Sequence, residues 1–407
     1  MGSATIRYSS FIMLICAIGS QLTDVSIGPL KAWEVFAITI FAVSLRTINK
    51  KFIPYILFFS LLLMTSIGAS FMSDAKFDDY GGLKSKYIIS VVRFIELMLC
   101  ILTAMTVFSA SQKYKLNTMD LISKFLRYNF FITIAVLFIF CADLVLKTKM
   151  VTYGVARLTG FYVEGGPYGL FMSTLIFLQL ISGNNKKSHL FIFTLALILA
   201  QSKAAIVALI ILIIINLMIK NKTLSSFLNP RNIVRFSISV LLFISAALFT
   251  TYNIAYNYIE DIKESSHTIN EKAYDKSFVM GRVAAYNIGP RIFLDNPLFG
   301  VGLGTYSLVR NDPKYSGNFP RVEDWDLTGL GGFFNLIVEN GLFGLLGFII
   351  ITFRFFRFDA TGIAFFSLFI IPFSLGAQLY MVYPWIYLGM YASLLNYRKI
   401  ETREQSV

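Results

Sequence analysis

One polar stretch of the chain carries residue types that bind phosphate. Residues 281–306 read GRVAAYNIGPRIFLDNPLFGVGLGTY and contain two arginines and three alternating glycines. They are Arg282, Arg291, Gly300, Gly302 and Gly304. An arginine side chain holds phosphate through a planar fork of N–H donors, and consecutive amides of a glycine-rich turn can form a nest for an anion. The composition of this stretch therefore predicts a phosphate site.

The spacing of Arg282 and Arg291 sets a geometric condition on that site. Nine residues along an unbroken helix place two side chains on opposite faces. Gly289 and Pro290 fall between the arginines, and we expect this pair to break or redirect the helix. Both guanidinium groups would then face one ligand. The alternative is that each arginine pairs with a local acid such as Asp295 or with lipid headgroups.

The glycines that follow allow two interpretations. An Asn-Pro turn and the alternating glycines make Gly302, Gly304 and Tyr306 candidates for ligand binding. The alternative is that the glycines only allow this loop to pack closely against the membrane. Arg310 and Arg321 lie further along the same polar region and are additional phosphate-binding candidates.

Two shorter motifs place charge at the boundary of apolar runs. Arg157 and Glu164 lie in RLTGFYVEGGPYG, directly before one apolar run, and Lys203 lies in QSKAA, between two others. An arginine, a lysine and a carboxylate at a membrane boundary suit a phosphate-sugar ligand. The alternatives are an interfacial anchor pair for Arg157 and Glu164, and a lysine that snorkels to the surface.

Carboxylates supply the candidate general bases. Asp326 lies in the acidic run EDWD, for which solvated surface acids are the simpler alternative, and Glu164 is the second candidate. Arg93 and Glu96 lie three residues apart inside an apolar run, and Glu339 lies inside another. Charges within a membrane span suggest function, while a mutual ion pair of Arg93 and Glu96 that fixes helix packing is the alternative.

The elements that would position these residues are membrane helices. The 407 residues are 56% hydrophobic and only 14% charged, with a mean hydropathy of +0.67. A soluble domain has about 25% charged residues. The apolar runs are continuous, whereas strands of a transmembrane β-barrel alternate. The sequence therefore predicts an all-α polytopic membrane protein.

We expect about twelve transmembrane helices, because roughly 20 apolar residues cross a bilayer core. The expected spans cover residues 9–29, 32–45, 52–72, 88–109, 129–146, 166–182, 189–201, 204–219, 236–253, 332–353, 361–377 and 379–396. They divide the chain into membrane helices within 1–253, a long loop over 254–331, and membrane helices with a tail over 332–407. The first part of the loop, Tyr258 to Ser277, is polar and expected to be helical.

Basic residues orient these spans. Alternate loops hold more than twice as many Lys and Arg as the short loops between them, which places both termini in the cytoplasm and the 254–331 loop outside. The net charge of +13 follows largely from this bias and does not imply nucleic acid. The three cysteines lie in apolar runs and the two histidines lack partners, so we expect no metal and no cofactor.

Four motifs, in this order, resemble one superfamily. The sequence reads RLTGFYVEGGPYG, then QSKAA, then GRVAAYNIGPRIFLDNPLFGVGLGTY, then NLIVENGLFG. This order resembles the O-antigen polymerase and ligase superfamily, the Wzy-type polymerases and WaaL-type ligases. The resemblance covers the whole chain in topology and about residues 157–344 in motifs. Lys203 departs from the pattern, since the family more often has arginine there.

The resemblance implies a GT-C-type glycosyltransferase that works without metal or nucleotide sugar. Such an enzyme transfers a glycan from undecaprenyl pyrophosphate at the outer face of the bacterial inner membrane. Arg282 or Arg291 would hold the donor pyrophosphate. The implied partners are undecaprenyl-pyrophosphate-linked oligosaccharides and membrane lipids, with a chain-length regulator and a flippase of the same pathway as further candidates.

One departure favours a polymerase within the superfamily. Ligases carry a histidine followed by an asparagine at the outer start of the helix with the Glu-x-Gly element, where this chain has Leu330 and Gly331. The enzyme alternative is an O-antigen ligase that transfers glycan to lipid A-core. The non-enzyme alternative is a flippase or transporter of lipid-linked sugars, although the halves of the chain show no repeat symmetry.

Overall fold

The computed structural model describes residues 3–27, 30–44, 50–113, 117–153, 156–183, 186–221, 282–317, 319, 321 and 331–404. This part of the chain is mainly helical. It also holds two short antiparallel hairpins, β1 (Ser26–Ile27) with β2 (Leu30–Lys31) and β3 (Thr152–Tyr153) with β4 (Arg157–Leu158).

The described residues form a series of helices. They are α1 (Ser3–Gln21), α2 (Ala32–Ser44), α3 (Ile53–Met72), α4 (Ile88–Lys113), α5 (Thr118–Leu146), α6 (Gly165–Ile181), α7 (Lys187–Leu199), α8 (Lys203–Asn221), α12 (Arg282–Asp295), α13 (Tyr306–Val309), α14 (Pro313–Ser316), α15 (Gly332–Phe355), α16 (Ala360–Ser374) and α17 (Val382–Glu404). Two single 3-10 turns, Lys50–Phe52 and Gly82–Lys84, precede α3 and α4.

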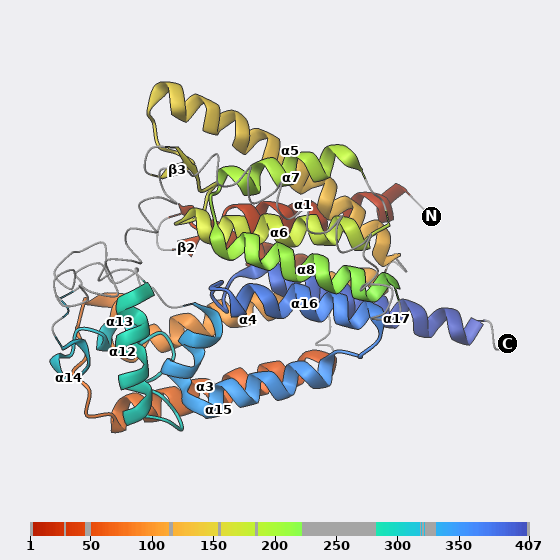
Figure 1. Ribbon diagram of the computed structural model, residues 1–407. Coiled ribbons are helices and arrows are strands. Elements are labelled where there is room, and N and C mark those ends of the chain that lie inside the picture. Colours follow the sequence, from red (N-terminus) through yellow and green to blue (C-terminus); the bar gives the residue numbers. More distant parts are fainter. Residues whose placement is uncertain are drawn as a thin grey trace.

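The long helices form one bundle (Figure 1). Helix α17 packs on α4, α6 packs on α7 and α8, and α1 packs on α5. Helix α1 begins and α17 ends at the same end of the bundle, while α12, α13, α14 and both hairpins gather at the opposite end. We call this opposite end the hairpin end. Most of the residues expected to do chemistry belong to it.

Four helical segments are long and apolar enough to cross a membrane. They are Lys50–Met72, Ile88–Lys113, Thr118–Leu146 and Gly332–Phe355, and further apolar helices of the described part are shorter. Most ends of these helices lie within a few residues of the end of an expected span. The expected span 236–253 and the polar stretch from Tyr258 to Ser277 lie outside the described residues.

The fifth expected span began too late. Helix α5 begins at Thr118, whereas hydropathy placed its start at residue 129. The Asn117 side chain accepts a hydrogen bond from the Met119 amide at 2.9 Å and caps the helix there. Hydropathy does not detect this start, because the first turns contain charged residues. A helix can extend beyond its apolar segment.

Aromatic side chains fill the core between α3, α15, α16 and α17. Trp385 is fully buried and makes edge contacts with Tyr55, Phe59 and Phe369 at ring-centre distances of 5.7, 5.9 and 5.2 Å. Its indole N–H donates a hydrogen bond to the Leu379 carbonyl at 2.8 Å. The loop between α16 and α17 is thereby fixed to the core.

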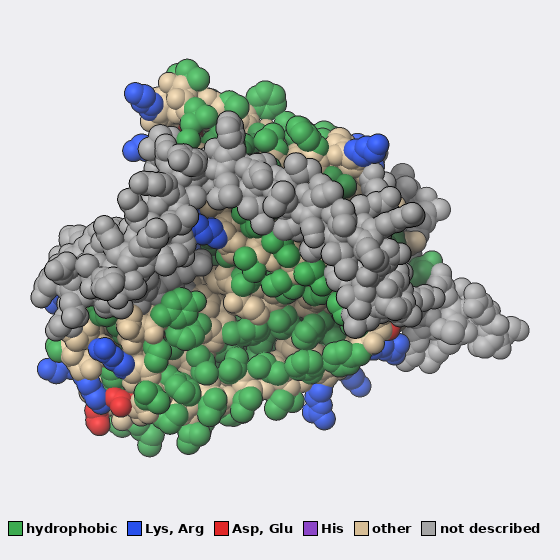
Figure 2. All heavy atoms as spheres, in the orientation of Figure 1, with side chains coloured by type: hydrophobic (Ala, Val, Ile, Leu, Met, Phe, Trp, Pro, Cys, Tyr) green, Lys and Arg blue, Asp and Glu red, His purple; other side chains and the backbone are tan. Residues whose placement is uncertain are grey.

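The bundle exposes apolar side chains in large numbers. Figure 2 shows hydrophobic side chains over α3 and α15, with Lys and Arg gathered toward the two ends of this face. Leu57, Leu61, Met64, Leu346 and Ile350 are among the exposed large hydrophobic residues on these two helices. An apolar surface of this extent is costly in water and suits a lipid environment. The fold is that of an integral membrane protein.

The expected break at Gly289-Pro290 does not occur. Helix α12 runs from Arg282 to Asp295 with Pro290 inside it. Gly289 lies against Phe334 and Val338 of α15, where the missing side chain allows close packing. This tertiary packing holds the helix together although proline removes one of its hydrogen bonds. Because α12 is one unbroken helix, the positions of Arg282 and Arg291 lie on its opposite faces.

Helix α15 is the element that does break. Gly341 has a φ of 63° and a ψ of −161°, so the helical ladder is interrupted after Asn340. The loop before α13 fills the break, because the amides of Leu342 and Phe343 donate to the carbonyls of Pro297 and Leu298 at 2.9 and 3.1 Å. The motifs DNPLFGVGLGTY and ENGLFG, about 40 residues apart, thus interlock.

We predict that Gly300→Ala strongly destabilises the protein. Gly300 has a φ of 65° and lies directly against the backbone of Glu339, so a methyl group would overlap it. The backbone conformation alone costs about 1–2 kcal/mol for an L-residue. Thermal unfolding in detergent micelles should show a clearly lower Tm. Gly68→Ala is the control, since nothing lies within 4 Å of its added Cβ in α3; equal Tm values for the two variants would contradict the interlock.

Candidate functional site

The loop of residues 296–306, here called the glycine loop, wraps around a carboxylate. The amides of Gly304 and Tyr306 donate to the two carboxylate oxygens of Glu339 at 2.8 and 3.3 Å, and the Gly302 amide donates to its carbonyl at 2.7 Å. An amide nest therefore forms as the glycines suggested. The anion in it belongs to the chain itself, which differs from the ligand role expected for Gly302, Gly304 and Tyr306.

Serine hydroxyls fix the other edge of the glycine loop. Ser70 of α3 donates to the Val301 carbonyl at 2.7 Å, and Ser90 of α4 donates to the Leu303 carbonyl at 2.8 Å. The loop lies wedged between the ends of α3, α4 and α15, and its buried backbone groups are satisfied by these contacts. It is a rigid part of the bundle, so it cannot close over a ligand without breaking these bonds.

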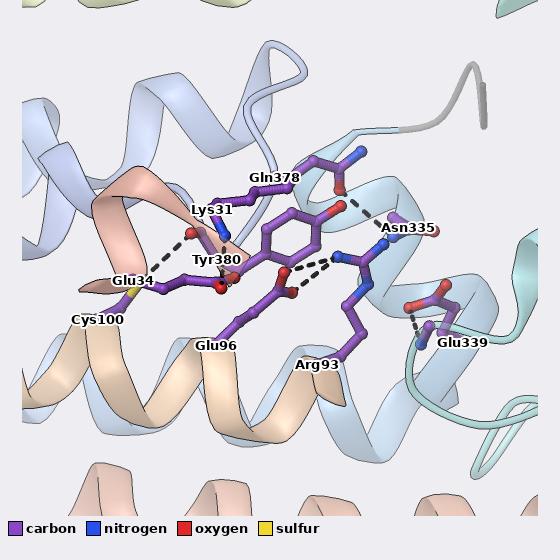
Figure 3. A network of polar contacts seen from close by, with 10 residues as sticks. Lys31, Glu34, Arg93, Glu96, Cys100, Asn335, Glu339, Gln378 and Tyr380 are labelled. Atoms are coloured by element: carbon purple, nitrogen blue, oxygen red, sulfur yellow. Dashed lines mark hydrogen bonds and ion pairs between the residues drawn. The ribbon is translucent and has the colours of Figure 1, made fainter. Parts of the chain in front are cut away.

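A buried charge network lies next to the glycine loop (Figure 3). Arg93 and Glu96 of α4 form an ion pair at 2.8 Å, which bears out the alternative of a mutual pair. The Arg93 guanidinium also lies over the Tyr380 ring, 4.3 Å from its centre. Figure 3 shows Arg93 between Glu96 and the helix that carries Glu339. Pairing and the aromatic face offset the cost of a charge within a span.

A small pocket of about 20 Å³ opens beside this network, and we call it the polar pocket. It lies between α4, the start of α15 and the loop that joins α16 to α17. Its polar lining consists of Arg93, Ser307, Asn335, Glu339, Gln378 and Tyr380. The sequence reading singled out Arg93 and Glu339 separately and missed Gln378 and Tyr380. The amide side chain of Gln378, in the otherwise apolar segment before α17, is a signal that could have found this loop.

Arg310 and Arg321 join the long loop to the loop between α3 and α4. Arg310 is 3% exposed, and burial lowers the pKa of its guanidinium, while Tyr306, Tyr80 and Asp78 act in the opposite direction. Arg321 donates to Asp78 at 3.1 Å. Both arginines are thereby tied to the loop between α3 and α4.

Arg291 and the acid expected to pair with it have separate partners. The Arg291 guanidinium is exposed and donates to the Tyr315 carbonyl at 3.1 Å. Asp295 forms an ion pair with Lys314 at 2.6 Å, and the hydrogen bond from Lys314 holds the pKa of Asp295 below its usual range. The side chain of Arg282 and all of Asp326 lie outside the described residues.

The motifs RLTGFYVEGGPYG and QSKAA meet at the hairpin end. Arg157 of β4 donates from Nε to the Ala200 carbonyl at 3.0 Å, and Ser202 donates from its hydroxyl to the Gly166 carbonyl at 3.2 Å. Glu164 precedes α6 and Lys203 begins α8, and both side chains are exposed. We call Arg157, Glu164 and Lys203 the α6–α8 cluster.

This cluster depends on close packing between α6 and the turn before α8. A side chain at Gly165 would lie 2.6 Å from the Ala200 carbonyl and 2.7 Å from the Arg157 guanidinium. The turn itself passes through Gln201 with a φ of 49°. Two cationic groups from segments more than 40 residues apart thus flank one junction, where they can receive an anionic group.

Comparison with known proteins gives one family match. Residues 189–349 match the Wzy_C family, described as O-antigen ligase. The matched segment contains Lys203, the glycine loop and Glu339, and it confirms the resemblance to the O-antigen polymerase and ligase superfamily. No curated protein matches the chain. The match indicates an enzyme that handles lipid-linked glycans and leaves polymerase and ligase equally consistent with it.

We predict that Glu339→Ala loosens the glycine loop. The amides of Gly304 and Tyr306 lose their acceptor, so their hydrogen exchange should accelerate about tenfold or more. Hydrogen–deuterium exchange with mass spectrometry measures this directly. Glu34→Ala serves as the control, because Glu34 is another buried acid that accepts a backbone hydrogen bond, from Lys31 at 2.9 Å. Unchanged exchange in the Glu339 variant would refute the nest.

Proposed function

We propose, from the superfamily match and the site geometry, that this protein is a surface-polysaccharide polymerase. It would transfer a growing glycan from undecaprenyl pyrophosphate to an undecaprenyl-pyrophosphate-linked repeat unit outside the cytoplasm. Of the two reactions in this superfamily we assign polymerisation to this protein, with O-antigen as the expected product. The enzyme would use no metal and no nucleotide sugar.

The α6–α8 cluster is the observation that carries this proposal. Arg157 and Lys203 come from two separate motifs, and the junction of α6 with α8 presents both at the hairpin end. A lipid-linked donor lies in the bilayer with its pyrophosphate at the surface, where a fork donor and a flexible ammonium group suit it. Arg282 and Arg291 of α12 are the further arginines assigned to the donor.

The proposed reaction is a displacement at the anomeric carbon of the donor. A hydroxyl oxygen of the acceptor sugar forms the new bond, and the bond from the anomeric carbon to the pyrophosphate oxygen breaks. The pyrophosphate leaves with the electron pair, and Arg157 and Lys203 stabilise its developing charge. A carboxylate takes the hydroxyl proton, with Glu164 at the cluster and Asp326 as the assigned candidates.

A sequence feature supports polymerase over ligase. Leu330 and Gly331 stand where the resemblance implies a histidine and an asparagine in ligases. His189 does not replace that histidine, since it is buried, bonds Gln179 at 3.1 Å and stacks on Phe130. It lies near the start of α7, at the other end of that helix from Ala200 and the α6–α8 cluster.

A ligase is the second candidate. The matched family is described by that activity, and the contacts of the α6–α8 cluster suit a lipid-linked donor in either enzyme. The two differ only in the acceptor, which is lipid A-core for a ligase. A flippase or transporter remains the non-enzyme alternative, and the rigid packing of the glycine loop against α3, α4 and α15 weighs against it.

The membrane setting belongs to the same proposal. We place the protein in the bacterial inner membrane with about twelve spans in a GT-C-type arrangement. Both termini would be cytoplasmic, the 254–331 loop periplasmic, and the hairpin end on the periplasmic side. The position of the start of α1 and the end of α17 at one end of the bundle supports this orientation.

We predict that Arg157→Ala and Lys203→Ala each lower polymer formation by about tenfold or more, because each removes a charge that stabilises the leaving group. Membranes supplied with undecaprenyl-pyrophosphate repeat units, analysed for product length, provide the measurement. Arg354→Ala is the matched control, since it removes one positive charge from the last turn of α15, far from the cluster. Wild-type product from both cluster variants at normal protein level would rule out this donor site.

We predict that a deletion strain keeps single repeat units on its lipid A-core and loses long chains. That outcome marks a polymerase, whereas carrier-linked polymer without any attachment would mark a ligase and overturn the reaction proposed here. Electrophoresis of the surface polysaccharide gives the answer. Complementation with Arg282→Ala and with Arg291→Ala tests these arginines in the same strain, and restoration of full-length chains by both would remove them from the donor site.

A further inference from the structure

The polar pocket has the size and lining of a binding site for one small polar group. Its volume of about 20 Å³ holds roughly one water-sized group. Asn335, Gln378 and Tyr380 at the pocket are only partly buried, so the pocket is not sealed inside the protein. A bound group would meet donors from amide and guanidinium side chains and acceptors from amide and carboxylate oxygens.

One acceptor in this pocket lacks a partner. The side-chain oxygen of Asn335 is buried and makes no hydrogen bond with the described residues, while its amide nitrogen donates to Gln378 at 3.4 Å. A buried acceptor without a partner costs free energy and is normally satisfied by a water or a ligand. Asn335 therefore lines the pocket as a residue whose side-chain oxygen has no donor among the described residues.

The charges at the pocket already have partners. Arg93 is paired with Glu96, and the carboxylate of Glu339 accepts two amides of the glycine loop. An ionic ligand would have to displace one of these interactions at considerable cost. A hydroxyl group can donate to the Asn335 oxygen and accept from a neighbouring amide without disturbing either pair.

We propose that the polar pocket receives a hydroxyl group of the glycan substrate and so selects its sugar. The inference rests on the proposed function, because a glycan must be handled at the hairpin end. The hydroxyl would replace a bound water and bond the side chains of Asn335 and Gln378. A site built to bond a hydroxyl discriminates strongly against sugars that lack it.

The test measures kinetics with two separable substrates. The donor is the undecaprenyl-pyrophosphate repeat unit, and the acceptor is the same repeat unit on an octyl aglycone, which has no pyrophosphate and can only accept. We expect Asn335→Ala and Gln378→Ala to raise the KM for either the donor or the acceptor about five- to tenfold. The kcat should stay within about twofold of wild type. A raised acceptor KM assigns the pocket to the acceptor sugar, and a raised donor KM assigns it to the donor glycan.

Two controls separate binding from structural damage. Ser374→Ala removes an exposed hydroxyl that bonds only its own helix at the Ile370 carbonyl, close to Gln378 in sequence. Ser70→Ala weakens the glycine loop at the Val301 carbonyl, and neither Ser70 nor Val301 lines the pocket. Both controls should keep wild-type KM values, even if Ser70→Ala has a lower Tm.

The outcomes distinguish this inference from the proposed function. If wild-type protein transfers glycan and the Asn335 and Gln378 variants keep both KM values, the pocket holds a structural water only and the inference is wrong. It is equally wrong if Ser70→Ala raises KM as much as they do. If wild-type protein transfers glycan neither to the octyl acceptor nor between undecaprenyl-pyrophosphate repeat units, the proposed function itself fails, and this inference fails with it.

Discussion

The contact on which the hairpin end depends is the bond between Glu339 and the glycine loop. A carboxylate inside a span has to be satisfied, and two loop amides satisfy it. The loop amides in turn need an acceptor, and the break at Gly341 provides room for the loop backbone. Without the carboxylate, the two loop amides would be buried donors without an acceptor. The break in α15 would then lose the loop that fills it.

This interlock positions the surrounding groups. It fixes the loop that leads from α12 to α13, and it brings Gly304 against Arg93 beside the polar pocket. The Arg93–Glu96 pair lies beside the pocket, and Figure 3 shows Glu34 and Lys31 on the other side of Glu96. A rigid lining of this kind suits recognition of a substrate group better than movement, since the elements that hold it come from three different helices.

The two polar regions at the hairpin end suit different parts of one substrate. The α6–α8 cluster offers an arginine and an exposed lysine, which suit a phosphate group. The polar pocket offers neutral donors and acceptors between charges that are already paired, which suits a hydroxyl. A lipid-linked glycan carries both groups, with a pyrophosphate at the membrane surface and sugars beyond it.

The sequence by itself determined the membrane class, the location of most helices and the segments that matter, because apolar runs and glycine-rich motifs are local signals. It also singled out Arg157, Lys203 and Glu339 as charged residues at the boundary of apolar runs or inside one. Tertiary structure alone decided which of these meet. Packing against α15 kept α12 intact across Pro290, and the unsatisfied backbone at Gly341 drew in the glycine loop. Such contacts join distant segments, and no local pattern encodes their partners.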